Sequence, residues 1–82
     1  MRAIEEDRFD AIDDEALESY LTKGADERRE TLVIEQRGDR WIAETFESGG
    51  LSGGRSVMLG AAGPDRRAAM LGLARKFEAA RW

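Results

Sequence analysis

Apolar residues recur at helical spacing in two stretches, one in the first third of the chain and one in the last. In the first stretch they fall adjacent or three to four positions apart, which predicts a helix from about Phe9 or Asp13 to Lys23. Its start has three candidate caps: Asp10, Asp13 and Asp14. Gly24 stands where a left-handed C-terminal cap belongs, so residues 24–30 are expected to form a polar connection.

The second helical stretch opens at Gly63 and Pro64, because proline suits the first turn of a helix and Asp65 suits its positive end. It is expected to run to Arg81 with one apolar stripe, formed by Met70, Leu73, Ala74, Phe77 and Ala80. A single core should collect apolar residues from both helices and from the segment between them: Leu17, Leu21, Leu32, Ile34, Met70, Leu73 and Phe77.

Three shorter segments between the helices are rich in β-branched or apolar residues and are bounded by turn residues, as strands are. They cover residues 31–36, 40–47 and 56–60. The first two are close enough in the chain to form a hairpin across Gly38 and Asp39. The register of this hairpin has two solutions, which differ by one residue in the turn.

The two registers place different side chains on the face that meets the helices. A two-residue turn groups Leu32, Ile34, Trp41 and Ala43. A three-residue turn groups Leu32, Ile34, Ile42 and Phe46. We favour the three-residue turn, because it gives both strands apolar residues toward the helices and leaves Trp41 near an edge.

Together these elements predict an α+β fold in the order α-β-β-β-α. A three-stranded antiparallel sheet with two helices packed on one of its faces is the natural layer arrangement for that order. The 82 residues are expected to form one small domain, in which residues 1–8 are a flexible N-terminal segment.

Charge is sorted along the chain, and this is its most informative feature for function. Residues 1–20 hold eight acids against two arginines, whereas residues 31–82 hold eight bases against six acids. The eight acids are candidates for binding a basic partner: Glu5, Glu6, Asp7, Asp10, Asp13, Asp14, Glu15 and Glu18. The alternative is a solvated helix face, since acids in a first helical turn are also favoured by the helix dipole.

The composition argues against catalysis and against bound cofactors or metals. The chain has no cysteine and no histidine, so it lacks thiolate ligands, imidazole ligands and the usual general base. Its four serines therefore have no histidine to activate them. We therefore expect a non-enzymatic protein. A cytoplasmic location is expected because the sequence starts acidic and has no apolar run near the roughly 20 residues of a membrane span. The high content of alanine, glycine and arginine suggests a GC-rich bacterial or phage genome, and hence a bacterial host cell.

Residues 49–56 approach a phosphate-binding loop of the Walker A type, with Arg55 in the place of its lysine. That motif needs a helix directly after it, whereas the following residues predict a strand. The chain is also too short for the parallel sheet of a nucleotide-binding fold. We therefore interpret this segment as a flexible loop.

Residues 60–74 carry small and basic residues at the start of the second helix, with Arg66 and Arg67 adjacent. Together with the order of elements from about Phe9 to Trp82, this resembles the double-stranded-RNA-binding domain. The resemblance implies that both arginines contact phosphates across the major groove. It supports a nucleic-acid-binding alternative with five cations: Arg55, Arg66, Arg67, Arg75 and Lys76. The tight first turn, the acidic first helix and Met70 in place of a third basic residue predict only weak binding.

The chain is similar in kind to anti-CRISPR proteins, which are inhibitors encoded by phages and mobile elements. The similarity lies in its small size, its charge layout and its acidic cluster. This resemblance implies an inhibitor whose acidic surface blocks a basic nucleic-acid-binding site on a protein or ribonucleoprotein complex, such as a CRISPR effector. A further alternative is a structural or regulatory subunit that pairs through a sheet edge or through Trp41 and Trp82. No membrane partner is expected.

Overall fold

The helices and strands follow one another in the predicted order, and the computed structural model describes residues 11–47 and 57–80. In chain order the elements are α2 (Asp14–Glu27), β1 (Glu30–Arg37), β2 (Arg40–Glu47), β3 (Val57–Gly63) and α3 (Arg66–Ala80). The α+β class and the α-β-β-β-α order are therefore confirmed. The expected flexible segment 1–8 and the glycine-rich loop 49–56 lie outside the described residues.

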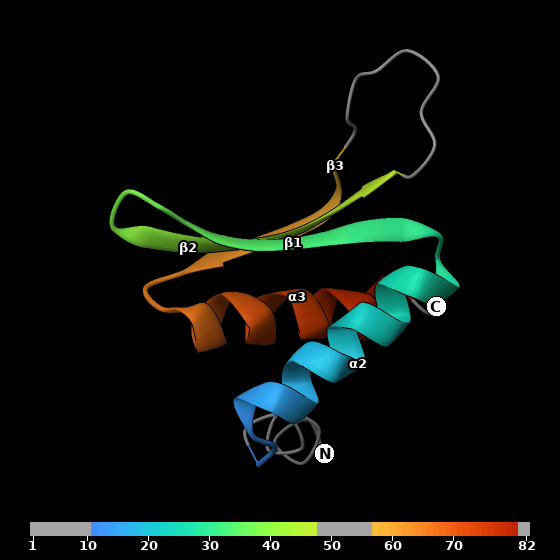
Figure 1. The fold of residues 1–82 in the computed structure, drawn as a ribbon, viewed down its shortest axis with the longest axis horizontal. Helices are drawn as coiled ribbons and strands as arrows, with labels where there is room; N and C mark the ends of the chain where they lie inside the picture. Colours follow the sequence, from blue (N-terminus) through green and yellow to red (C-terminus); the bar gives the residue numbers. More distant parts are fainter. Residues whose placement is uncertain (1–10, 48–56, 81–82) are drawn as a thin grey trace.

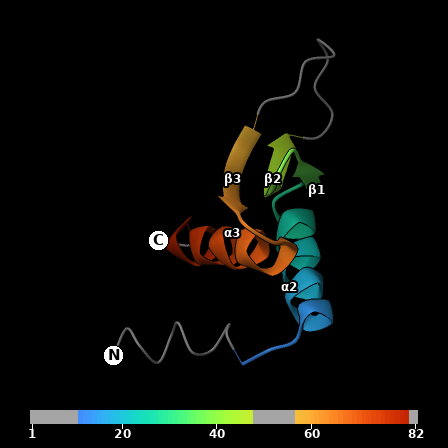
Figure 2. The same ribbon diagram turned by 90° about the vertical axis from the view of Figure 1, so that its left-hand side faces the viewer.

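The structure has two layers, a sheet and a pair of helices (Figure 1). The strands are antiparallel neighbours in the order β1-β2-β3, and both helices cover the same face of the sheet. Turned by 90°, the molecule shows α2 beneath β1 and α3 beneath β3 (Figure 2). The two helices run in the same direction, since Asp14 lies beside Arg67 and Gly24 lies beside Phe77.

Helix α2 starts at one of the candidate caps but ends later than expected. Asp13 is the N-cap, and its carboxylate accepts a hydrogen bond of 2.8 Å from the backbone N–H of Ala16. The predicted end at Lys23 is wrong, because the helix continues through Gly24 to Glu27. The expected polar connection 24–30 is correspondingly reduced, since β1 already begins at residue 30.

Gly24 is a contact point between helices rather than a C-terminal cap. A Cβ atom at this position would lie 2.7 Å from Cε2 of Phe77, so the absence of a side chain lets the ring of α3 pack against α2. The left-handed conformation after α2 belongs to Arg29, whose φ is 59°. Glycine at position 24 therefore has a packing reason that a helix-end signal does not include.

The β1–β2 hairpin has the register that we did not favour. Arg37 pairs with Arg40, so the turn holds only Gly38 and Asp39, and Gly38 takes a φ of 64°. A positive φ at the first of two turn residues is one that tight hairpins assign to glycine. The helix-facing side of the hairpin therefore carries the set of the two-residue turn: Leu32, Ile34, Trp41 and Ala43.

Close packing of α3 on the sheet explains why the register of the three-residue turn, which would place Ile42 and Phe46 toward the helices, does not form. Ala43 is fully buried beneath the helices, where Ile42 of the other register would need more room. On the neighbouring strand, a Cβ atom added to Gly72 of α3 would come within 2.8 Å of the Ala61 side chain. Small residues on both partners thus set the distance between the layers.

Strand β3 and helix α3 meet further along the chain than the sequence predicts. The strand extends to Gly63 instead of Gly60, so Pro64 lies in the connection and not in the first helical turn. Asp65 accepts a hydrogen bond of 2.8 Å from the N–H of Ala68 and in this way caps α3. The expected strand start at residue 56 and the expected helix end at residue 81 lie outside the described residues.

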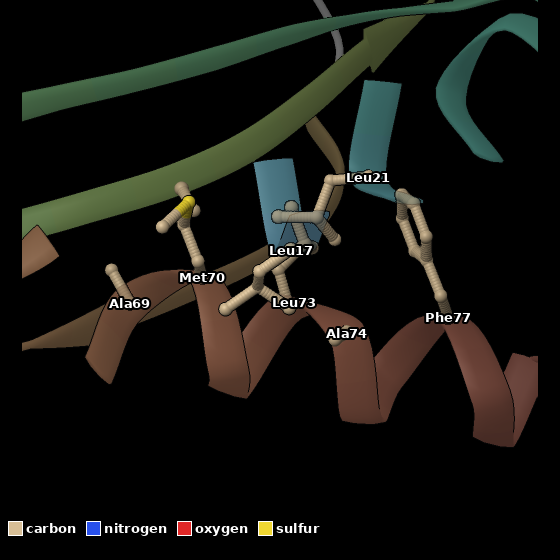
Figure 3. Close-up of a cluster of buried hydrophobic side chains, with 8 residues drawn as sticks. Leu17, Leu21, Ala69, Met70, Leu73, Ala74 and Phe77 are labelled. Carbon is tan, nitrogen blue, oxygen red and sulfur yellow. The ribbon is translucent and has the colours of Figure 1, made fainter. Parts of the chain in front are cut away.

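The core fills the space between the sheet and the helices and contains the predicted residues (Figure 3). Five of them are buried: Leu17, Leu21, Met70, Leu73 and Phe77. Leu32 and Ile34 are partly buried and pack against this cluster, whereas Ala80 of the predicted stripe is exposed. Trp41 also packs against the core, so the expectation that it lies near an edge is wrong.

Candidate interaction surface

Half of the acidic cluster can be placed in the structure. Glu5, Glu6, Asp7 and Asp10 lie outside the described residues. The other four acids occupy the cap and first two turns of α2: Asp13, Asp14, Glu15 and Glu18. Asp13 is engaged as the N-cap, which is the local role that the helix dipole and the orphan N–H groups favour.

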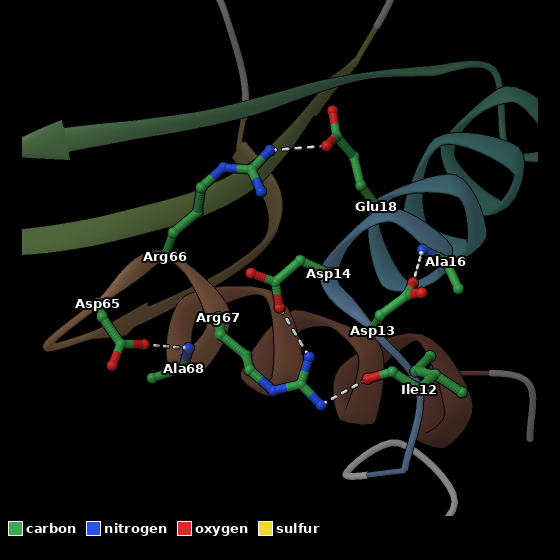
Figure 4. A network of polar contacts seen from close by, with 9 residues as sticks. All are labelled: Ile12, Asp13, Asp14, Ala16, Glu18, Asp65, Arg66, Arg67 and Ala68. Carbon is green, nitrogen blue, oxygen red and sulfur yellow. Dashed lines mark hydrogen bonds and ion pairs between the residues drawn. The ribbon is translucent and has the colours of Figure 1, made fainter.

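Two of these acids bind the two arginines at the start of α3 (Figure 4). Nη2 of Arg66 lies 2.7 Å from Oε1 of Glu18, and Nη1 of Arg67 lies 2.7 Å from Oδ1 of Asp14. Arg67 also donates a hydrogen bond of 2.7 Å to the backbone carbonyl of Ile12. Two acids proposed to bind a basic partner are thus paired with two arginines proposed to bind nucleic acid.

These ion pairs offset the unfavourable placement of two arginines at the N-terminus of α3. Its first turn carries Arg66 and Arg67 and no acid, although the positive end of the helix dipole disfavours cations there. Because α2 runs parallel to α3, the acids of its first two turns lie where they can neutralise both arginines. Glu15 is exposed and makes no ion pair with another described residue.

The remaining candidate cations do not join Arg66 and Arg67 in one patch. Arg55 lies outside the described residues, and Arg75 is exposed on α3. Arg75 follows Arg66 by nine residues, which turns it to the opposite side of the helix and about 13 Å further along the axis. Lys76 donates a hydrogen bond to the backbone carbonyl of Gly60 on β3.

A separate group of ion pairs lies on the sheet face away from the helices. Arg37 binds Glu35, and its Nη2 lies 3.0 Å from Oε1 of Glu44. The hydrogen bond that Arg37 donates to Glu35, together with the charges of Glu35 and Glu44, raises the pKa of Arg37 above its ordinary value, although desolvation opposes the rise. Arg37 therefore remains a cation and offsets part of the negative charge around it.

Two grooves flank α2. One of about 360 Å³ lies toward the last turns of α3, and its lining residues are Tyr20, Lys23, Gly24, Glu27, Arg28 and Phe77. The other, of about 490 Å³, lies between α2 and β1, and it includes the acids Glu18, Asp26 and Glu30 beside Leu32, Ile34 and Arg66. Within the described ranges no group of acids is arranged to hold a metal ion.

The groove between α2 and β1 is a feature that sequence reasoning missed. Asp26 and Glu30 were expected in a loop, because the helix was expected to end before them. The sequence does contain a signal for the longer helix: Ala25 follows Leu17 and Leu21 at a spacing of four and so continues the apolar face past Gly24.

Comparisons with protein-family models, with curated proteins and with solved structures find no match for this chain. Neither of the two described helices is long and apolar enough to cross a membrane. Charge and geometry are therefore the observations from which a function can be argued.

Proposed function

We propose that this chain is a non-enzymatic interaction protein that binds a basic surface of its partner through the acidic residues at and before the start of α2. The observation that carries this proposal is the pairing of Arg66 with Glu18 and of Arg67 with Asp14. It engages, with carboxylates, two of the five cations on which the nucleic-acid-binding alternative depends. It uses only two of the eight candidate acids.

The acids that bind the partner are then those not needed inside the molecule. Asp13 caps α2, while Asp14 and Glu18 hold α3. Of the described acids this leaves Glu15, and we propose that it acts together with Glu5, Glu6, Asp7 and Asp10, which lie outside the described residues. Carboxylates of this kind steer a basic partner and disfavour nucleic acid, whose phosphates they repel.

The partner class that fits is a protein or ribonucleoprotein complex with a basic nucleic-acid channel. A compact acidic protein can occupy such a channel and exclude the nucleic acid from it, as the similarity in kind to anti-CRISPR proteins implies. We therefore propose that the protein is an inhibitor and that its target is a CRISPR effector. The structural-subunit alternative gains less support, because Trp41 packs against the core and Trp82 lies outside the described residues.

The experiment measures target-DNA cleavage by a panel of purified CRISPR effector complexes with increasing amounts of the protein. The test variant carries Glu5→Lys, Asp10→Lys and Glu15→Lys. The matched control carries Glu27→Lys, Asp39→Lys and Glu47→Lys, three exposed acids elsewhere, so both variants change the net charge equally. We expect inhibition by the natural chain and the control, and at least a tenfold loss of potency in the test variant.

Equal losses in the two variants would show that net charge alone acts, and this would contradict a recognition surface at α2. Undiminished cleavage by every effector of the panel would contradict the proposed target. Both variants leave Asp13, Asp14 and Glu18 unchanged, so we expect the fold to be preserved. Thermal unfolding of both variants checks this.

A further inference from the structure

The sheet has two edges, and the chain treats them differently. In the order β1-β2-β3, each outer strand is hydrogen-bonded to a strand on one side only within the described residues. Such an edge presents backbone donors and acceptors to which an extended segment of another chain can add. The surroundings of each edge decide what can bind there.

The edge at β1 lies beside the groove between α2 and β1. Thr31, Leu32 and Ile34 of β1 line this groove, and Thr22 and Asp26 of α2 line its other side. Leu32 and Ile34 are only partly buried, so they offer apolar surface to a side chain placed there. An edge strand with a helix alongside is the arrangement in which peptides are held by strand addition.

The groove at β1 is electronegative. Its lining carries the carboxylates of Glu18, Asp26 and Glu30, of which Glu18 pairs with Arg66 and Glu30 with Arg28, so one negative charge is left over at Asp26. Asp26 is exposed and makes no ion pair with another described residue. It stands in the last turn of α2, which contains no basic residue, so its charge adds to the negative end of the helix dipole.

An acid in a last helical turn is unfavourable for the helix itself. Nothing within the described part of the molecule compensates Asp26, whereas Glu18 and Glu30 are paired with Arg66 and Arg28. The side chain of Arg28 lies over Phe77 of α3, with its guanidinium carbon 5.6 Å from the centre of the ring. A cation supplied from outside is what this position lacks.

The edge at β3 has the opposite character. Lys76 of α3 reaches this strand and donates a hydrogen bond to the carbonyl of Gly60. A lysine beside an edge strand occupies an acceptor that an incoming strand would use, and it repels a basic segment. Charge therefore directs a basic strand to β1 and away from β3.

From these observations we infer that the groove between α2 and β1 binds an extended basic peptide segment, which adds to β1 as a fourth strand. Its backbone pairs with the outer edge of β1, and its alternate side chains point toward α2. Lysine or arginine at these positions meets Asp26, with Glu18 and Glu30 close by. The inference rests on the proposed function only in taking the partner to be basic.

The length of the strand sets the length of the segment. β1 has eight residues, which corresponds to about 26 Å of extended chain. A suitable probe is a capped seven-residue peptide with lysine at positions two, four and six, valine at positions three and five, and threonine at both ends. Its binding is followed by calorimetry with the complete chain, and amide resonances report where it binds.

Three matched peptides separate strand addition from simple charge attraction. One has the same composition with its three lysines adjacent. The other two carry N-methyl groups, each on one of the two sets of alternate residues, so that each loses the donors of one edge. We expect saturable binding of the alternating peptide and at least tenfold weaker binding of the adjacent-lysine peptide. N-methylation of one alternate set should abolish binding, while N-methylation of the other set should leave it within twofold.

Two protein variants locate the site. Asp26→Lys should weaken binding at least tenfold, because it places a cation where the peptide brings its own. Asp39→Lys makes the same charge change in the exposed hairpin turn at the other end of β1, and it should change the affinity less than twofold. Equal losses in the two variants, or binding indifferent to both N-methyl patterns, would overturn the inference.

The remaining outcomes also decide it. Self-association of the natural chain that Asp26→Lys abolishes, without peptide binding, would assign the edge to a second copy and overturn the inference. If the peptide binds as expected while no effector is inhibited, the groove stands and the proposed function fails. If inhibition depends on Glu5, Asp10 and Glu15 but the peptide does not bind, the groove inference fails alone.

Discussion

Gly24 lies within α2 with the ring of Phe77 packed against its backbone. The ring is fixed on its other sides, since its centre lies 6.3 Å from the Tyr20 ring and 5.6 Å from the Arg28 guanidinium carbon. A side chain at position 24 therefore cannot be accommodated by a simple rotation of Phe77. The cost of glycine in a helix interior, about 1 kcal/mol, is accepted here for close helix packing.

Gly24→Ala tests this contact. The added methyl group overpacks the interface, which typically costs about 1–3 kcal/mol, while the better helix propensity of alanine returns part of it. We expect a net loss of about 1 kcal/mol in the free energy of unfolding, measured by urea titration. In a Phe77→Leu background the same substitution should cost less, because the ring that it meets is gone.

Ser19→Ala at an exposed position of α2 is the control for helix propensity alone, and it should change stability by less than about 0.5 kcal/mol. Stabilisation by Gly24→Ala in the natural background would show that the two helices are further apart than the structure has them.

At the scale of elements, the parallel pair of helices is held by different interactions along its length. Ion pairs join the first turns through Asp14 with Arg67 and Glu18 with Arg66. Apolar packing dominates the middle, and the hydroxyl of Tyr20 donates a hydrogen bond to Glu78 further along. Sequence alone shows Asp14 and Glu18 only as like charges that repel at i, i+4 spacing.

Reversal of one charge distinguishes repulsion within α2 from attraction between the helices. Asp14→Lys would relieve the stack of acids but place an ammonium beside Arg67. Because the pair is partly exposed, its coupling should be about 0.2–1 kcal/mol, and the melting temperature should fall by a few degrees. The swap Asp14→Lys with Arg67→Glu should recover part of this loss, measured by thermal unfolding at low and high salt.

A rise in melting temperature with Asp14→Lys alone would mean that repulsion within α2 outweighs the ion pair. Equal effects at low and high salt would also argue against an electrostatic origin, since exposed pairs are screened.

The predictability of these elements follows from how local their causes are. The span of β2 depends on neighbouring residues and follows from the sequence, and the cap at Asp13 is one of the three that the sequence offers. The hairpin register depends on how closely α3 approaches Ala43, and the end of α2 depends on Phe77. The ion pairs join residues about fifty positions apart, so charge sorting shows both partners without showing that they meet.

At the scale of the whole molecule, the net charge of −4 is unevenly neutralised. Arg66 and Arg67 are each engaged by a carboxylate with which a phosphate would have to compete, while Arg75 points to the side of α3 opposite Arg66. Tight binding to nucleic acid requires several phosphates to be neutralised together. Among the described cations of α3, Arg66 and Arg75 thus lie on opposite sides of the helix.

We therefore expect no tight binding to duplex RNA. Titration with a 20-base-pair duplex at physiological salt should give at best a dissociation constant of roughly 10⁻⁴–10⁻⁶ M, typical of non-specific contacts. Glu18→Gln with Asp14→Asn, which releases both arginines, should strengthen binding at low salt. A nanomolar constant for the natural chain would instead support the nucleic-acid-binding alternative.

The order of the elements also has a consequence for how the chain folds as it is synthesised. Met70, Leu73 and Phe77 all belong to α3, the last described element, which packs against β2, β3 and α2. A nascent chain that has already formed the hairpin therefore exposes Trp41 and Ala43 until α3 has been made. We therefore expect the sheet to be completed and covered only after α3 has been synthesised, since a domain of this kind folds as a unit.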